Sequence, residues 1–140
     1  MEDFAKKLAI NHHVKKHSSR KSFPRASLKK EYQVITKAYQ ILGESVTKDV
    51  SIAPSGEWLL DNFYIIEEQY HFCMQHLLFK EYQKLPSVQG KARILVLAQE
   101  LVNFTDGNIS EEIIRKFFLS YQTKRSLNME EIAAFPLMLK

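Results

Sequence analysis

Large apolar residues recur every three or four positions along most of the 140-residue chain, and no segment sustains the alternation of apolar and polar residues typical of a half-buried strand. Only four glycines and four prolines interrupt this pattern. A spacing of three and four residues places side chains on one face of a helix. The pattern therefore predicts an all-α fold, a single helical domain of about six helices that are mostly antiparallel neighbours, over residues 1–140.

The expected elements are separated by turn and breaker residues. A first helix is expected over residues 1–17, a basic linker over 18–26 and a helical core over 27–140. Within the core, the pattern predicts helices over residues 27 to 45–47, 51–55 to 74, 91–105, 111–124 and 128–136, with a short helix around 78–84. The helix over 91–105 is apolar on nearly all sides, which predicts that it is the most buried.

Residues that favour helix N-termini precede several of these segments. Asp3 and Ser27 are candidate N-caps of the first two helices, and Ser110 is a candidate cap followed by two acidic residues. Asn128 has Glu131 three positions later, the spacing of a capping box. The last helix is therefore expected to begin at a defined residue.

The C-terminal segment "FPLMLK" is apolar where an exposed chain end is usually polar. Pro136 is expected to stop the last helix, because proline has no amide hydrogen to donate. An apolar end predicts that the 140 residues are a fragment of a longer chain.

The overall composition is that of an ordinary globular protein. Hydrophobic residues make up 45% of the chain and charged residues 26%, which excludes the disordered, collagen-like and disulfide-framework classes. A single cysteine and the lack of a secretory leader pattern predict a reduced, cytoplasmic setting. No apolar run approaches the roughly 18 residues of a membrane-spanning helix.

Basic residues concentrate in the segment "KKHSSRKSFPRASLKK", which contains no acid. Its first five basic residues form a candidate anion-binding patch: Lys15, Lys16, Arg20, Lys21 and Arg25. Such a patch suits anionic lipid or nucleic acid. A solvated linker between two helices is the favoured interpretation. Nucleic acid is a poor candidate, because the segment lacks interleaved aromatic residues and any groove-reading motif.

The segment "EWLLDNFYIIEEQ" gathers carboxylates on one helix face. At 100° per residue, Glu57, Asp61, Tyr64 and Glu68 fall close together. Glu57 and Asp61 suit a general acid/base pair or a site for a hard cation. The favoured alternative is structural: the acids pair with basic residues of neighbouring helices, for which the candidates are Arg93, Arg115 and Lys91.

The remaining faces of this helix are apolar. One strip lies opposite the acids, and Trp58, Ile65 and Phe72 form a second strip. The helix is therefore expected to be buried on most of its circumference, with Cys73 an inert core thiol.

No cofactor, metal site or catalytic residue is expected. His13 and His17 share a helix face but lack a third ligand nearby, and Cys73 points away from His71 and His76. Glycine-rich phosphate loops, GxSxG, HExxH and paired CxxC motifs are absent.

Three segments carry a resemblance to a known family: "EWLLDNFYIIEEQ", "LAQELVNFTD" and "EEIAAFPLMLK". They resemble the N-terminal region of cyclic β-1,2-glucan synthases, large membrane-bound bacterial proteins that polymerise glucose from UDP-glucose. This sequence departs from the family's usual Thr-Pro-Ala-Ala at Ala53-Pro54-Ser55-Gly56, and from its charged continuation after Gln69.

The resemblance implies a parent enzyme with a glycosyltransferase, membrane helices and a phosphorylase-like domain, none of which lies in these residues. It implies that this chain is an N-terminal helical accessory region with no catalysis of its own, at the cytoplasmic face of the bacterial inner membrane. Its expected partner is the remainder of the parent polypeptide. The alternative is an independent helical module that binds anionic lipid or nucleic acid through Lys15–Lys30. The oligomeric state is left open.

Overall fold

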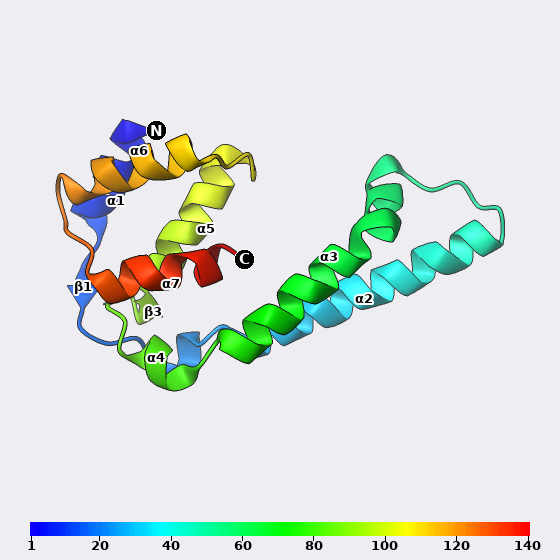
Figure 1. Cartoon of the computed structure of the whole chain (residues 1–140), viewed down its shortest axis with the longest axis horizontal. Helices are drawn as coiled ribbons and strands as arrows, with labels where there is room; N and C mark the ends of the chain where they lie inside the picture. Colours follow the sequence, from blue (N-terminus) through cyan, green and yellow to red (C-terminus); the bar gives the residue numbers. More distant parts are fainter. The chain divides into compact units, whose positions relative to one another are not determined.

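The computed structural model describes residues 1–140 and confirms the all-α class, with seven α-helices and three two-residue strands (Figure 1). Its contacts divide the chain into two compact units. The first, which we call the core unit, comprises residues 1–23 and 78–140; the second, the hairpin unit, comprises residues 24–77. The single domain over 1–140 stays a prediction, and each unit is described by itself.

The core unit is built around α5 (Arg93–Thr105). Helix α7 (Met129–Leu139) packs against α5, and α1 (Glu2–Asn11) packs against α6 (Glu111–Gln122). A short helix, α4 (Phe79–Gln83), begins the second segment of the unit. The expectation that α5 is the most buried helix is confirmed, since it holds six buried residues.

The hydrophobic core draws on every helix of this unit. Ala5 and Ala9 are fully buried, because their small side chains allow α1 to lie close to its neighbours. The other buried members are apolar or aromatic: Tyr82, Leu85, Ala92, Ile94, Leu95, Leu97, Ala98, Leu101, Phe117, Tyr121, Leu127 and Phe135. Burying this apolar surface is the main term that stabilises the unit.

A small antiparallel sheet closes one end of the core unit, and the sequence pattern did not predict it. Strand β1 (Val14–Lys15) pairs with β2 (Ser87–Val88), which pairs with β3 (Lys91–Ala92). The turn between β2 and β3 consists of Gln89 and Gly90, both with positive φ, as a two-residue hairpin turn requires. Two-residue strands are too short for period-two alternation to identify them.

This sheet explains why α1 ends at Asn11 and not at His17 as expected. His12 takes an extended conformation, and the chain then enters β1, whose backbone groups bond to β2. The predicted basic linker also contains structure: η1 (Arg20–Ser22) is a 3₁₀ turn capped by the Ser19 side chain. Sheet and cap satisfy backbone groups that a longer helix would otherwise have paired.

The hairpin unit consists of two antiparallel helices, α2 (Arg25–Thr47) and α3 (Pro54–His76), which lie side by side in Figure 1. Aromatic rings hold them together. The ring centroids of Tyr32 and Tyr70 lie 3.8 Å apart and those of Tyr39 and Phe63 lie 4.1 Å apart, both stacked.

Burial in the hairpin unit is slight. Helix α2 has no buried residue, and α3 has one, Cys73, as expected of that thiol. The prediction that α3 is buried on most of its circumference is therefore wrong. The reason is geometric: one neighbouring helix covers only one side of another, and no third helix of the unit covers the rest.

Two of the predicted caps are confirmed and two are wrong. Ser110 accepts a hydrogen bond from the Ile113 amide, and Asn128 forms a capping box with Glu131. Asp3 lies within the first turn of α1, which follows Met1, and Ser27 donates its hydroxyl to the Pro24 carbonyl from inside α2. Both side chains lie after the residue at which their helix begins.

Helix α7 continues through Pro136 to Leu139, so the predicted stop at this proline is wrong. Pro136 removes one backbone hydrogen bond, to the carbonyl of Ile132. Its neighbour Phe135 is buried, and Met138 and Leu139 pack against the core. Burial on both sides of the proline offsets the lost bond. None of the helices combines the length and the apolar character needed to cross a membrane.

Replacing Asn128 by alanine tests the capping box. We expect the substitution to lower the free energy of unfolding by about 1 kcal/mol, because the Glu131 amide loses its side-chain acceptor. Asn103→Ala, at an exposed position inside α5, is the matched control and should not destabilise the protein. Equal losses in urea denaturation of the two variants would contradict the assignment of Asn128 as a cap.

Candidate functional site

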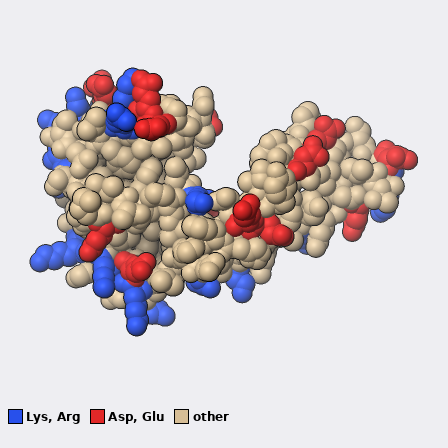
Figure 2. Space-filling view, viewed as in Figure 1, with Lys and Arg blue, Asp and Glu red and all other residues tan.

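The acidic face predicted on α3 is exposed to solvent. Glu57, Asp61, Tyr64 and Glu68 all lie on this continuous helix, and none of their side chains takes part in a hydrogen bond or ion pair of the structure. Figure 2 shows acidic side chains along the hairpin unit. No group of three or more His, Cys, Asp or Glu side chains is arranged to hold a metal ion.

The three basic residues expected to pair with these acids each have a partner within the core unit, and pairing between the two units stays a prediction. Arg93 pairs with Glu131, Arg115 pairs with Glu111 one turn earlier on α6, and Lys91 donates to the side-chain oxygen of Gln99. All three basic residues belong to the core unit, whereas α3 belongs to the hairpin unit. Helical spacing groups side chains on one face but does not tell which other helix will meet them.

The five residues of the predicted basic patch are exposed. Lys15 lies in β1, and the Arg20 guanidinium lies 4.6 Å from the centroid of the Phe79 ring. Arg25, in the hairpin unit, donates to the Met74 carbonyl at 2.7 Å. The two arginines thus have protein partners, while Lys16 and Lys21 lie in the solvent. Anion binding at this patch stays a prediction.

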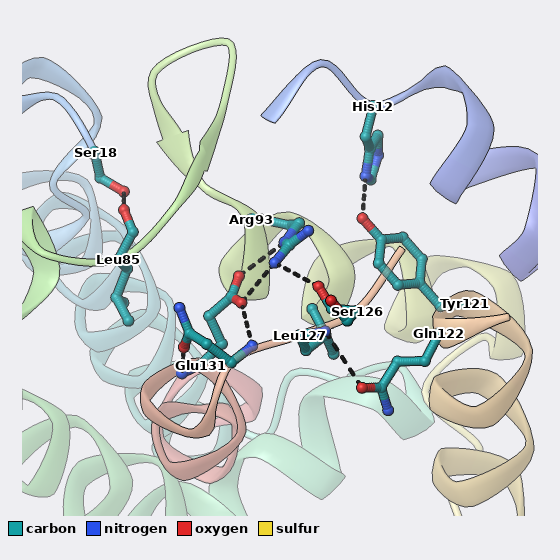
Figure 3. Close-up of polar contacts among 10 residues, drawn as sticks. His12, Ser18, Leu85, Arg93, Tyr121, Gln122, Ser126, Leu127 and Glu131 are labelled. Atoms are coloured by element: carbon teal, nitrogen blue, oxygen red, sulfur yellow. Dashed lines mark hydrogen bonds and ion pairs between the residues drawn. The ribbon is translucent and has the colours of Figure 1, made fainter. Parts of the chain in front are cut away.

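A buried ion pair, which the sequence analysis missed, joins the starts of α5 and α7. Arg93, at the start of α5, forms two parallel hydrogen bonds to Glu131 of α7, with Nε–Oε1 and Nη2–Oε2 distances of 2.8 and 2.6 Å (Figure 3). The Arg93 side chain is 6% exposed and that of Glu131 is fully buried. Arg93 Nη2 also donates to the Ser126 carbonyl at 3.1 Å.

Glu131 has two structural roles at once. Its Oε2 atom accepts from Arg93 and, at 2.9 Å, from the Asn128 amide, which is the reciprocal half of the capping box. The pair therefore fixes the start of α7 against the start of α5. The signal available in the sequence was an arginine at the edge of an otherwise apolar helix, together with an acid whose position a capping box already specified.

A second buried contact joins α1 to α6. His12 Nδ1 lies 2.9 Å from the Tyr121 hydroxyl, and the Arg93 guanidinium lies 5.9 Å from the Tyr121 ring centroid. Burial raises the pKa of Tyr121, although the charge of Arg93 opposes the effect, so the hydroxyl keeps its proton and can donate it to a neutral imidazole.

Electrostatic effects around this contact disfavour a charged histidine. Burial, together with the positive charges of Arg93 and Arg125, holds the pKa of His12 below its ordinary value. For Arg93, burial alone would lower the pKa, but the hydrogen bonds and negative charge of Glu131 outweigh it and raise the pKa. Every buried side-chain polar atom of the structure has a hydrogen-bond partner. The polar atoms of this network are therefore paired within the protein, and none is left unsatisfied for a ligand.

Comparison with known proteins points to one type of enzyme. The chain is 29% identical over 120 residues to the cyclic beta-(1,2)-glucan synthase NdvB of Rhizobium meliloti (strain 1021). The aligned region covers 83% of this chain and 4% of that protein. No family model matches the chain, and no solved structure matches it. The chain is thus similar to a small part of a much longer bacterial protein.

Arg93→Met is expected to lower the free energy of unfolding by about 3–5 kcal/mol, because it leaves the Glu131 carboxylate buried without a cation. Glu131→Gln should also destabilise the protein, because it leaves the buried Arg93 guanidinium without an anion, although glutamine can still complete the capping box. Arg115→Met removes the same type of residue from an exposed pair and should change stability little. A similar loss for Arg93→Met and Arg115→Met in thermal denaturation would show that burial does not strengthen the pair.

The depressed pKa of His12 predicts a pH dependence of stability. The unfolded chain takes up this proton near pH 6.5, whereas the folded chain takes it up at a lower pH. The free energy of unfolding should therefore fall as the pH drops below 6.5 towards the pKa of the folded state. His12→Gln should remove this part of the slope, and His13→Gln, at an exposed position, should not. An unchanged slope in His12→Gln would contradict the prediction.

Proposed function

We propose that this chain is the N-terminal helical region of a cyclic β-1,2-glucan synthase-like glycosyltransferase that makes β-1,2-glucan from UDP-glucose. In this proposal the region supports or positions the transferase and carries out no chemical step itself. The observation that carries the proposal is the similarity to NdvB, which extends over 83% of the chain and is not confined to one motif. The proposed partner is the remainder of the parent polypeptide, at the cytoplasmic face of the bacterial inner membrane.

The geometry supports a structural role. General acid–base catalysis requires side chains within hydrogen-bond reach of each other or of a substrate held in a cleft. The acids of α3 are exposed on a single helix, and the buried carboxylate of Glu131 is fully engaged by Arg93 and Asn128. A compact core unit whose buried polar atoms are all paired suits a scaffold.

The second candidate is an independent module that binds anionic lipid through Lys15–Lys30. The observation that favours it is a run of seven basic residues without an acid, five of which are the exposed members of the predicted patch. Binding of this kind must weaken as salt rises. Failure to bind phosphatidylserine vesicles at low ionic strength would eliminate this candidate.

The reading frame of the gene gives the first test of the main proposal. It should continue past Lys140 into a membrane-bound glycosyltransferase. A stop codon directly after Lys140 would overturn the proposal and leave the independent module as the better account.

The full-length protein gives the second test. Asp61→Asn should leave glucan synthesis from UDP-glucose in isolated membranes unchanged, because the exposed carboxylate has no chemical step to perform. Arg93→Met should lower synthesis only in proportion to the loss of folded protein, measured by quantitative blotting of the same membranes. A large loss of synthesis per molecule in Asp61→Asn would assign catalysis to the acidic face.

A further inference from the structure

The positive charge of the core unit is concentrated in two segments that lie far apart in the sequence. Residues 12–23 and 78–92 together contain seven lysines and arginines and one acid, Glu81. The rest of the core unit contains eight basic and eight acidic residues, so its formal charges cancel. The hairpin unit contains five basic and seven acidic residues. The positive net charge of the chain therefore originates in these two segments.

Hydrogen bonds hold the two segments against each other. The Ser18 amide donates to the Gln83 carbonyl at 3.1 Å, and the Ser18 hydroxyl donates to the Leu85 carbonyl at 2.7 Å. The Ser87 hydroxyl donates to the His17 carbonyl at 2.7 Å, beside the pairing of β1 with β2. The backbone that carries the basic side chains is thus held in place by the fold, which lowers the entropy lost when a ligand binds.

Six of the seven basic residues are exposed and form no ion pair, and we call them the basic surface: Lys15, Lys16, Arg20, Lys21, Lys80 and Lys84. The seventh, Lys91, is half-buried and donates to the side-chain oxygen of Gln99. Figure 2 shows lysine and arginine side chains gathered at the end of the core unit that contains β1 and α4, with acidic groups beside them.

Helix α4 contributes two lysines on one face. Lys84 caps α4 with a helical backbone, so it lies one turn after Lys80 and about 40° from it around the helix. Glu81 lies about 60° from Lys84 on the far side from Lys80. One carboxylate cannot neutralise six cations, and the surface keeps a positive charge.

This surface differs from the patch that the sequence predicted. Lys80 and Lys84 lie some 60 residues from that patch in the sequence, and the fold of the core unit brings their segment beside it. Arg25 belongs to the hairpin unit, where it donates to the Met74 carbonyl. Lys29 and Lys30 belong to the hairpin unit as well.

We propose that the basic surface binds the anionic headgroups of a membrane leaflet. The proposal rests on the proposed function, which places the parent polypeptide at the inner membrane, and it identifies the surface by which this region meets that membrane. Each lysine or arginine close to an anionic leaflet adds to the attraction, and the contributions accumulate over the six residues. The attraction acts within a Debye length of the leaflet, about 10 Å at 0.1 M salt.

The aromatic residues of the two segments favour lipid over nucleic acid. Binding of single strands without sequence preference needs exposed rings on which bases stack. The Phe23 ring packs against those of Phe79 and Tyr82, with centroid separations of 5.4 and 5.3 Å. The Arg20 guanidinium covers the Phe79 ring as well. All three rings are engaged within the protein.

An apolar side chain beside the lysines also suits a membrane. Leu78 directly precedes α4, two residues before Lys80, and is 50% exposed. Basic residues together with an exposed leucine are typical of surfaces that lie in the headgroup region with an apolar group at the acyl boundary.

Sedimentation of the 140-residue chain with phosphatidylglycerol vesicles tests the proposal. The wild type should bind at low ionic strength, release as salt rises and ignore phosphatidylcholine vesicles. Lys80→Glu/Lys84→Glu should weaken binding at least about tenfold, because two attractive charges become repulsive. Circular dichroism should show unchanged helix content, since both positions are exposed.

Lys29→Glu/Lys30→Glu is the matched control, at exposed positions of α2. It lowers the formal net charge from +4 to zero, as the test variant does, but leaves the basic surface intact. Its binding should stay within a few-fold of the wild type. If charge reversal disturbs α4, Lys80→Gln/Lys84→Gln should still bind more weakly than Lys29→Gln/Lys30→Gln.

Three results would overturn the proposal: no binding to anionic vesicles at low ionic strength, an equal loss in the two charge-reversal variants, or binding to nucleic acid without binding to vesicles. An equal loss would show that the attraction follows the total charge of the chain and not this surface. Failure of the proposed function gives a different result, a stop codon directly after Lys140, which vesicle binding does not affect.

Discussion

The buried pair of Arg93 and Glu131 is the interaction on which the core unit depends. Removing both charges from water is costly, and only the two parallel hydrogen bonds, with the further bonds to the Ser126 carbonyl and the Asn128 amide, offset that cost. These bonds can form only when α5, α7 and the turn before α7 are in one arrangement. An apolar contact at the same place would tolerate sliding of α7 along α5. The ion pair does not, so it selects one packing of helices whose apolar faces alone would allow several.

Short-range signals predicted the parts of the fold that short-range physics determines. The cap of α6 at Ser110 and the capping box of α7 depend on atoms within four residues, and both are confirmed. The apolar circumference of α5 predicted its burial in the same way. The prediction that the helix stops at Pro136 was wrong because burial of Phe135, which packs against residues distant in the sequence, outweighs the backbone hydrogen bond lost at the proline. The end of α1 was predicted wrongly for the same reason. The helix gives way to strand β1, which pairs with β2, a segment more than 70 residues away.

At the candidate site, too, short-range signals predicted the local arrangement but not the contacts with distant residues. Helical spacing correctly gathered Glu57, Asp61 and Glu68 on one face of α3, because that depends only on the helix repeat. It could not give their partners, since an exposed lysine or arginine can pair with any acid that the tertiary structure brings near. Arg93 was one of the candidates, and its true partner, Glu131, was already assigned to a cap. The sequence analysis gave Glu131 one local role, whereas the structure gives the same carboxylate two.

The two units differ in how much of its apolar surface each helix can bury. In the core unit, α1, α5, α6 and α7 surround one another, so a helix with a wide apolar face can bury nearly all of it. In the hairpin unit each helix has one neighbour, and one neighbour covers one strip. Helices α2 and α3 nevertheless both carry a second strip of exposed apolar residues, with the same repeat of seven. Exposed tryptophan and isoleucine at single positions need no explanation. A strip of them on each helix follows from the two-helix architecture, since the hairpin unit has no third helix to cover the far side of either.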